Sequence, residues 1–478
     1  MPHVIHNAED TCLINQPTQQ AQGEARPRPG DAVAASPTPA PRNDVEKCIA
    51  SANNSDHVDT SPSSEAGMGH PDGGLKAWLV VFGSFCAMGA IYGLINTSAV
   101  FESYFRTHQL SDYNHSEIGW IFSLYLFLVF FVGVQVGPLF DRFGPRWLVA
   151  AGTSCITASL MLLSVSETYY QIMLTYSVLG GLGGALLNAP AYSAITHWFD
   201  KKRGFATGIA TTAGGIGGIV FPLILQPLLA ENGVGFPWAC RILGFIMLGL
   251  SIPANLFIRS RDAIQNAESG KPKSIWPDFT IFRELQYTIT CAGFFFMEWG
   301  LFVPITYIIS YTLAFGIGSQ DASMMLSLLN AGSVLGRFLP GLLADRVGRF
   351  NVIIVTIGFC IVTVLGIWLP CQGNFGVLVA FCILFGFASG SNLGLIPVCF
   401  SQFCHPQQFG RYFATANMVA SFGTLSSVPI GGALLSLGQN KLGWTALILF
   451  SGLSYAIALC CYLAARVLSA GWNPRTKF

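Results

Sequence analysis

Twelve apolar segments, each long enough to cross a lipid bilayer, constrain this chain more than any other feature. A spanning helix needs about 20 mostly apolar residues. Sustained runs favour helices over the strands of a barrel, which alternate apolar and polar side chains. The sequence therefore predicts an all-α membrane protein. The expected spans are 77–101, 117–140, 147–165, 170–194, 204–229, 239–258, 287–313, 322–344, 351–369, 375–399, 410–436 and 443–466.

Composition supports the same class. Only 10% of the 478 residues are charged and 52% are hydrophobic, whereas a soluble domain carries about 25% charged residues. This excludes an ordinary soluble enzyme, and the net charge of +1 gives no reason to expect a nucleic-acid partner. Residues 1–71 contain no apolar run and are rich in Pro, Ser, Ala and Asn, so we expect a disordered cytoplasmic tail there.

The distribution of Lys and Arg predicts the orientation. With the N-terminus inside, the inner loops carry thirteen basic residues and the outer loops carry three. Basic residues concentrate in cytoplasmic loops. We therefore expect both termini in the cytoplasm, in the plasma membrane, with the vacuole or another organelle membrane left open.

The chain also has the pattern of a duplication. A polar segment at 259–284 separates six spans in 72–258 from six in 285–478, so two pseudo-symmetric six-helix bundles are expected. The sequence G-P-L-F-D-R-F-G ends at Gly144, and G-L-L-A-D-R-V-G ends at Gly348. The aspartates of these two copies lie 204 residues apart.

This repeated motif resembles the loop motif of the major facilitator superfamily. Its glycines permit a tight turn, and its charged side chains can bond to helix ends and to neighbouring helices. The resemblance implies a carrier that works by alternating access. A topogenic loop would also carry basic residues, but it would not need the duplicated aspartates. The expected gating residues are Asp141, Arg142, Arg146, Asp345, Arg346 and Arg349.

Two further motifs narrow the resemblance. D-G-G-L-K-A-W, from Asp72 to Trp78, is similar to the entry to the first helix of the monocarboxylate transporter family. W-F-D-K-K-R-G-F-A-T-G, from Trp198 to Gly208, is similar to that family's signature before the fifth helix, most closely in its fungal branch. The resemblance implies a carrier of monocarboxylates or related organic acids, often coupled to protons.

The chain departs from that family at two positions. Asn96 stands where the animal carriers have a substrate lysine, and Ser333 stands where they have an aspartate four residues before a conserved arginine. That arginine is matched by Arg337. Simple lactate–proton symport therefore does not follow from the resemblance.

A count of charges points to two residues deep in the membrane. Arg337 is the only cation, and Glu298 the only acid, that cannot be assigned to a tail, a loop or a helix end. A charge at the bilayer centre costs about 2.5 kcal/mol or more, so it normally faces a cavity or a partner. We expect Arg337 to contact an anionic solute and Glu298 to carry a coupling proton. A structural ion pair between the two is the alternative.

The remaining site predictions are individually weaker. Asn114 begins a glycosylation sequon in the first outer loop. The histidines and cysteines have no metal-ligand spacing, so neither a metal nor another cofactor is expected. The other candidates for the substrate cavity are polar residues within spans: Tyr92, Asn96, Asn188, Tyr307, Asn330 and Asn392.

The leading functional hypothesis is a secondary active transporter of a small organic acid, with proton coupling left open. The expected partners are an anionic small molecule, the lipid bilayer and protons. Export of a fungal secondary metabolite is the alternative within the same class. A membrane sensor with the carrier fold would need a folded or motif-rich tail. A membrane-embedded hydrolase would need a nucleophile with a base, and no G-x-S-x-G occurs.

Overall fold

A computed structural model describes residues 72–113, 115–230, 232–260, 275–436, 441–473 and 476. The expected tail (1–71), the glycosylation candidate Asn114 and residues 261–274 of the expected linker lie outside the described residues. The part of the chain that is described contains twelve helical spans, and each overlaps one of the predicted segments. The prediction of an all-α membrane fold is confirmed.

Six spans precede the segment at 259–284 and six follow it. The first six are built from α1 (Leu75–Asn96) with α2 (Ser98–Thr107), α3 (His115–Phe131) with α4 (Gly133–Phe143), α5 (Arg146–Leu163), α6 (Tyr169–Ile172) with η1 (Met173–Leu179) and α7 (Gly180–Trp198), α8 (Arg203–Leu229), and α9 (Phe236–Phe257). The last six are α11 (Leu285–Ala314), α12 (Ser319–Val347), α13 (Arg349–Ile361) with η3 (Val362–Trp368), α14 (Phe375–Phe400), α15 (Phe409–Ser436), and α16 (Lys441–Ala470).

Several spans are not uniform α-helices. The first is interrupted at Thr97, whose hydroxyl donates to the Leu94 carbonyl at 2.7 Å, and the second at Val132. The segments η1 and η3 are π-helical, and such segments often occur at functional sites. Apolar periodicity cannot predict these interruptions, because both helix types bury a similar face.

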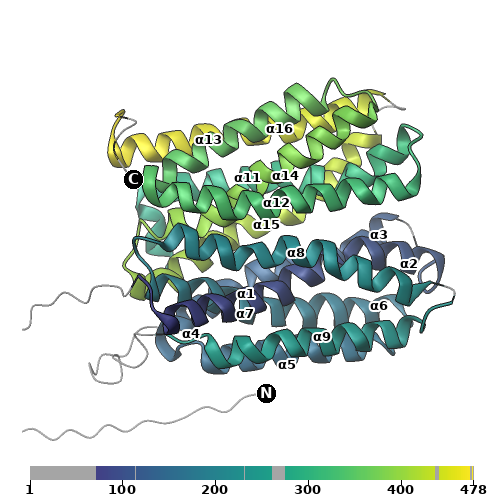
Figure 1. Cartoon of the computed structure of the whole chain (residues 1–478), viewed down its shortest axis with the longest axis horizontal. Helices are drawn as coiled ribbons and strands as arrows, with labels where there is room; N and C mark the ends of the chain where they lie inside the picture. The colour runs from purple at the N-terminus through teal and green to yellow at the C-terminus, as the bar shows by residue number, and fades with distance from the viewer. Residues whose placement is uncertain are drawn as a thin grey trace, which may run out of the picture. The chain divides into compact units, whose positions relative to one another are not determined.

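The two halves of the unit Met68–Phe478 meet along α8 and α12, and along α15 with α3 and α4 (Figure 1). Glycines allow the close approach of α8 to α12. A Cβ at Gly204 would lie 2.6 Å from the Gly341 carbonyl oxygen, and a Cβ at Gly208 would collide with the Arg337 carbonyl. Small residues permit such contacts between membrane helices.

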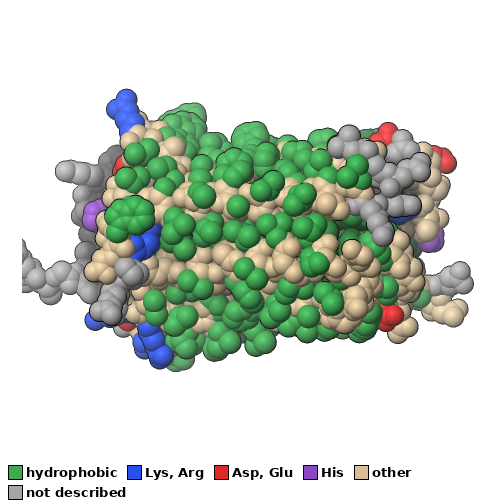
Figure 2. Space-filling view, turned by 90° about the horizontal axis from the view of Figure 1, so that it is seen from above, with side chains coloured by type: hydrophobic (Ala, Val, Ile, Leu, Met, Phe, Trp, Pro, Cys, Tyr) green, Lys and Arg blue, Asp and Glu red, His purple; other side chains and the backbone are tan. Residues whose placement is uncertain are grey.

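The surface matches a membrane environment. Hydrophobic side chains cover the long sides of the described unit, and charged side chains gather at its two ends (Figure 2). We call the end that carries residues 141–146 and 345–349 the motif end. The opposite end is called the far end.

Candidate functional site

Arg337 lies on α12 at the boundary between the halves, with 7% of its surface exposed. Its Nη1 donates to the Thr211 carbonyl oxygen of α8. A Cβ added at Gly214 would collide with this Nη1 atom. The same Cβ would lie 3.0 Å from the Tyr92 Cβ. No described residue hydrogen-bonds to the Arg337 Nε. A buried cation with an unused donor is a ready site for an anion.

A second group of polar side chains faces this guanidinium from the N-terminal half. The Tyr92 hydroxyl on α1 donates to Asn188 Oδ1 at 3.2 Å and lies 3.3 Å from the Tyr192 hydroxyl, both on α7. Arg337 interacts electrostatically with both tyrosines. Residues from α1, α7, α8 and α12 therefore meet at one place, which we call the central site: Tyr92, Asn188, Tyr192, Thr211, Gly214 and Arg337.

Glu298 lies on α11 and is fully buried. Neither of its carboxylate oxygens has a hydrogen-bond partner among the described residues. It interacts electrostatically with Tyr92 and Tyr192 of the central site and with Tyr455 on α16. Burying a carboxylate without a partner strongly favours its neutral form.

The ion pair considered as an alternative from the sequence is wrong for this structure. Glu298 and Arg337 do not pair anywhere in the described chain. The physical reason is the direction of the two side chains. Arg337 turns toward α8, whereas the Glu298 Cβ packs 3.5 Å from the Cβ position of Gly423 on α15. Two charges deep in the membrane need not be in contact.

The other predicted cavity residues form hydrogen bonds to backbone carbonyls or to other side chains. Asn96 donates to the carbonyls of Tyr92 and Gly214 at 2.8 and 3.1 Å, so its amide group joins α1 to α8 beside the central site. Tyr307 donates to the Val428 carbonyl at 2.7 Å. Both side chains thus tie one helix to another.

Two predicted asparagines also make structural bonds. Asn330 donates to the Leu326 carbonyl at 3.1 Å and packs on Gly218 of α8. Asn392 accepts a bond from Thr356 at 2.7 Å inside the C-terminal half. The structure therefore brings Tyr92 and Asn188 to Arg337 but leaves Asn330 and Asn392 outside the central site.

Sequence reasoning missed three members of the central site. Tyr192 lies four residues after Asn188, and this spacing places both side chains on one face of a helix. That signal could have identified it. Thr211 contributes a backbone carbonyl and Gly214 contributes space, and neither leaves a signal in the sequence.

At the motif end, each repeated aspartate caps a helix of the other half. Asp345 accepts from the Gly204 and Phe205 amides at the start of α8, both at 2.8 Å. Asp141 accepts from the Gly410 and Arg411 amides at the start of α15, at 3.2 and 2.9 Å. A carboxylate at a helix N-terminus binds unpaired amides and the positive end of the dipole. We call these two contacts the latches.

The latch of Asp345 has additional support. Arg349 donates to the Asp200 carbonyl at 2.6 Å, across the boundary between the halves. Arg203, which the sequence prediction missed, is buried and donates to the Ser401 hydroxyl at 2.8 Å. Its place within the signature before the fifth helix was the available signal.

The two family-like signatures meet in space. Asp72 Oδ1 accepts from the amides of Asp200 and Lys201 at 2.7 and 2.8 Å. Trp78 packs edge-on against Phe199, with 5.3 Å between ring centroids. The entry motif therefore holds the turn that precedes α8.

The side chains of the other predicted gating arginines form no hydrogen bond or ion pair with the opposite half in the described part of the chain. Arg142 lies over the Phe143 ring at 5.0 Å. Arg142, Arg146 and Arg346 are all exposed. A gating role for these three arginines stays a prediction.

The end of the expected linker reaches the motif end. Gln135 on α4 donates to the Ile275 carbonyl at 3.0 Å, and Arg411 lies 3.9 Å from Asp278. Hydrogen bonds from the Thr280 hydroxyl and amide, at 2.6 and 3.0 Å, hold the pKa of Asp278 below its ordinary value. Asp278 is therefore ionised at neutral pH beside the helix that Asp141 caps.

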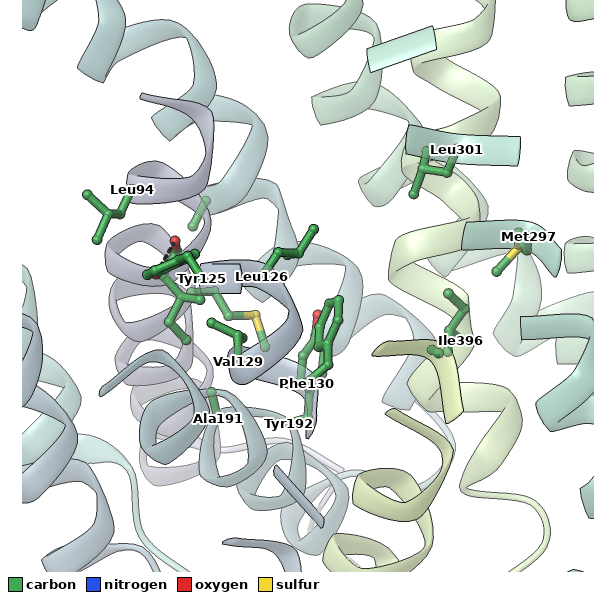
Figure 3. Packing of buried hydrophobic residues seen from close by; sticks show 14 of the residues in the cluster. Leu94, Tyr125, Leu126, Val129, Phe130, Ala191, Tyr192, Met297, Leu301 and Ile396 are labelled. Atoms are coloured by element: carbon green, nitrogen blue, oxygen red, sulfur yellow. Dashed lines mark hydrogen bonds between the residues drawn. The ribbon is translucent and has the colours of Figure 1, made fainter. Parts of the chain in front are cut away.

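Buried apolar side chains lie on both sides of the boundary near Tyr192 (Figure 3). Phe130 and Tyr192 stand at the boundary on the N-terminal side, and Met297, Leu301 and Ile396 lie across from them.

With this geometry described, sequence comparison identifies the family. The major facilitator superfamily profile matches residues 77–425 and 288–477. The chain belongs to the major facilitator superfamily. As a member, it is an integral membrane protein that carries small-molecule solutes, and it is a transporter rather than an enzyme.

Related proteins agree. The chain is 38% identical over 408 residues to the MFS-type transporter opdF of Penicillium oxalicum, covering 85% of this chain and 94% of that protein. It is 35% identical to the fujikurins efflux protein of Gibberella fujikuroi, over 84% of each chain. It is 33% identical to the riboflavin transporter MCH5 of Saccharomyces cerevisiae, covering 84% of this chain and 80% of that one.

Solved structures share the fold. The human organic anion transporter MFSD10 superposes with a TM-score of 0.60 at 14% identity, and the E. coli fucose:proton symporter FucP with 0.61 at 16%. Each comparison covers 80% of this chain and 98% of the other.

Proposed function

We propose that this transporter moves a small organic anion by alternating access, with the anionic group bound by Arg337. The observation that carries the proposal is the free Nε of this buried guanidinium, among hydroxyl and amide groups of the other half. A dehydrated carboxylate needs a charged donor inside the membrane. Arg337 can supply one without losing its bond to Thr211.

We propose that Glu298 couples transport to protons. The anion would not have to break an ion pair between Arg337 and Glu298, because none is present. Its negative charge would instead act on Glu298 across Tyr92 and Tyr192, and would favour the protonated acid. Anion and proton would then cross together without an unpaired charge in the low-dielectric interior.

We further propose that the latches close the motif end in this conformation, and that this end faces the cytoplasm. Both latches bond one half to a helix of the other, so they must break when that end opens. The inner-loop excess of basic residues supports the orientation. Labelling of single cysteines at 262–275 from outside intact cells would contradict it.

A more specific candidate is export of an acidic secondary metabolite. Two observations favour it: the two tyrosines beside Arg337, and the efflux proteins among the relatives. Metabolite profiling of cells with and without the protein, inside and outside, tests both versions. An acid that accumulates inside cells lacking the protein indicates export, and one depleted inside indicates import. No change in any acid would contradict the proposed substrate class.

A further inference from the structure

An open groove lies on the membrane-facing side of the C-terminal half. It has a volume of about 580 Å³ and is formed by α12, α13 and α14. Its walls include Leu339, Leu343, Val355 and Val362, which are between 48% and 70% exposed, together with Phe387. The groove is thus an apolar hollow within the spanning surface.

The groove runs from the motif end toward the middle of the membrane. Its lining on α13 and the first residue of η3 extends from Asn351 to Val362, a length of about 16 Å at 1.5 Å per residue. A bilayer has a hydrocarbon core about 30 Å thick. The length of the groove therefore matches a large part of one leaflet.

A cation stands at the motif end of the groove. Val347 lines the groove, and Arg346 precedes it directly. Arg346 is exposed, and no described residue forms a hydrogen bond or an ion pair with it. Nearby Arg349 is already bonded to Asp200. Arg346 is thus available to a group outside the protein.

We propose that this groove binds one anionic glycerophospholipid. One acyl chain lies along α12 and α13, and the phosphate and carboxylate of a phosphatidylserine-type headgroup contact Arg346. The apolar lining excludes a polar ligand, and the cation at the membrane surface selects an anionic headgroup. The site is separate from the central site, and so it does not depend on the proposed substrate.

Two glycines supply a matched test. A Cβ at Gly358, in the groove, meets no atom within 4 Å, and the same is true of Gly249 on the membrane face of α9. Gly358→Phe therefore fills the groove without a collision at its base, and Gly249→Phe adds the same side chain elsewhere. Gly358→Leu is a smaller version that should give a graded effect.

The full chain is reconstituted in vesicles of phosphatidylcholine, phosphatidylserine and ergosterol in equal parts, gently extracted, and weighed by native mass spectrometry. We expect one retained phosphatidylserine on the unaltered protein and on Gly249→Phe, and little on Gly358→Phe. Arg346→Gln should reduce the preference for phosphatidylserine over phosphatidylcholine by about fivefold. Arg142→Gln, which changes the corresponding arginine of the other half, should not.

Equal phosphatidylserine retention by Gly358→Phe and Gly249→Phe would overturn the proposal. So would ergosterol or a second copy of the chain bound in place of phospholipid. An unchanged headgroup preference in Arg346→Gln would refute the assignment of the cation.

Discussion

The latch aspartates at the motif end find hydrogen-bond partners within the chain, whereas the charged groups at the centre of the membrane lack some of theirs among the described residues. At the motif end, Asp141 and Asp345 each accept two backbone hydrogen bonds. At the centre, the Arg337 Nε and both oxygens of Glu298 have no partner among the described residues. A buried polar group without a partner is costly and needs an explanation.

Under the proposed function, the difference separates groups that stabilise this conformation from groups that bind a ligand. The latch aspartates are satisfied by this chain in this conformation, so they stabilise it. The Arg337 Nε and the Glu298 oxygens have no such partner among the described residues, and under the proposed function a solute and a proton supply the missing partners. Substitutions at the two places should therefore change different quantities.

The largest effect is expected from Glu298→Gln. The amide cannot gain or lose a proton, so accumulation of solute under an imposed pH difference should be abolished, while exchange of solute across the membrane persists. Both fluxes are measured in vesicles loaded with the transported acid. Glu117→Gln, at the exposed start of α3, is the control. Accumulation by Glu298→Gln against the gradient would place the coupling elsewhere.

A smaller but clear loss is expected from Gly214→Ala. Its Cβ would collide with the Arg337 Nη1, and overpacking costs about 1–3 kcal/mol. If the collision displaces the guanidinium from the position in which it binds the solute, apparent solute affinity should drop by about tenfold or more. Gly133→Ala meets no atom within 4 Å and should change nothing. Equal solute affinity in Gly214→Ala and Gly133→Ala would show that Gly214 is not part of the binding site.

The latches should change rates rather than affinity. Asp141→Asn and Asp345→Asn each remove the negative charge at a helix N-terminus and replace one of the two accepting oxygens with an NH2 group, which costs about 1 kcal/mol. We expect normal insertion, slower transport at equal surface expression, and more frequent opening of the motif end in distance measurements by electron spin labels. The Asp345 variant should open less, because Arg349 and Arg203 also hold its side. Unaltered kinetics in both would remove the gating role.

The sequence predicted the spans well because a membrane demands long apolar helices. It also found Arg337 and Glu298, because deep charges are rare and easily recognised. It could not predict whether these two residues touch, since contact depends on the rotation of each helix and the direction of each side chain. The sequence also could not predict the hydrogen-bond partners of Asp141 and Asp345, because the backbone amides that bond to these aspartates lie in the other half of the molecule.

The smallest effect is expected from substitutions of two asparagines that the sequence predicts as cavity residues. Their hydrogen-bond partners, like the directions of the Arg337 and Glu298 side chains, could not be predicted from the sequence. Asn188 bonds to Tyr92 in the central site, whereas Asn392 bonds to Thr356 inside one half. A neutral hydrogen bond contributes about 1 kcal/mol, so Asn188→Ala should weaken solute affinity by about fivefold. Asn392→Ala should leave affinity intact and lower the thermal unfolding temperature. The reverse pattern would move the site into the C-terminal half.

The central claim is that Arg337 recognises the negative charge of the solute. It is tested by comparing inhibition of transport by the solute acid and by its neutral amide, in the unaltered protein, Arg337→Lys and Arg337→Gln. A charged hydrogen bond contributes about 1.5–3 kcal/mol, so the unaltered protein should prefer the acid by about tenfold to a hundredfold. Lysine keeps the charge but loses the planar fork, so the preference should shrink in Arg337→Lys and vanish in Arg337→Gln. An equal preference for the acid in folded Arg337→Gln would contradict the claim.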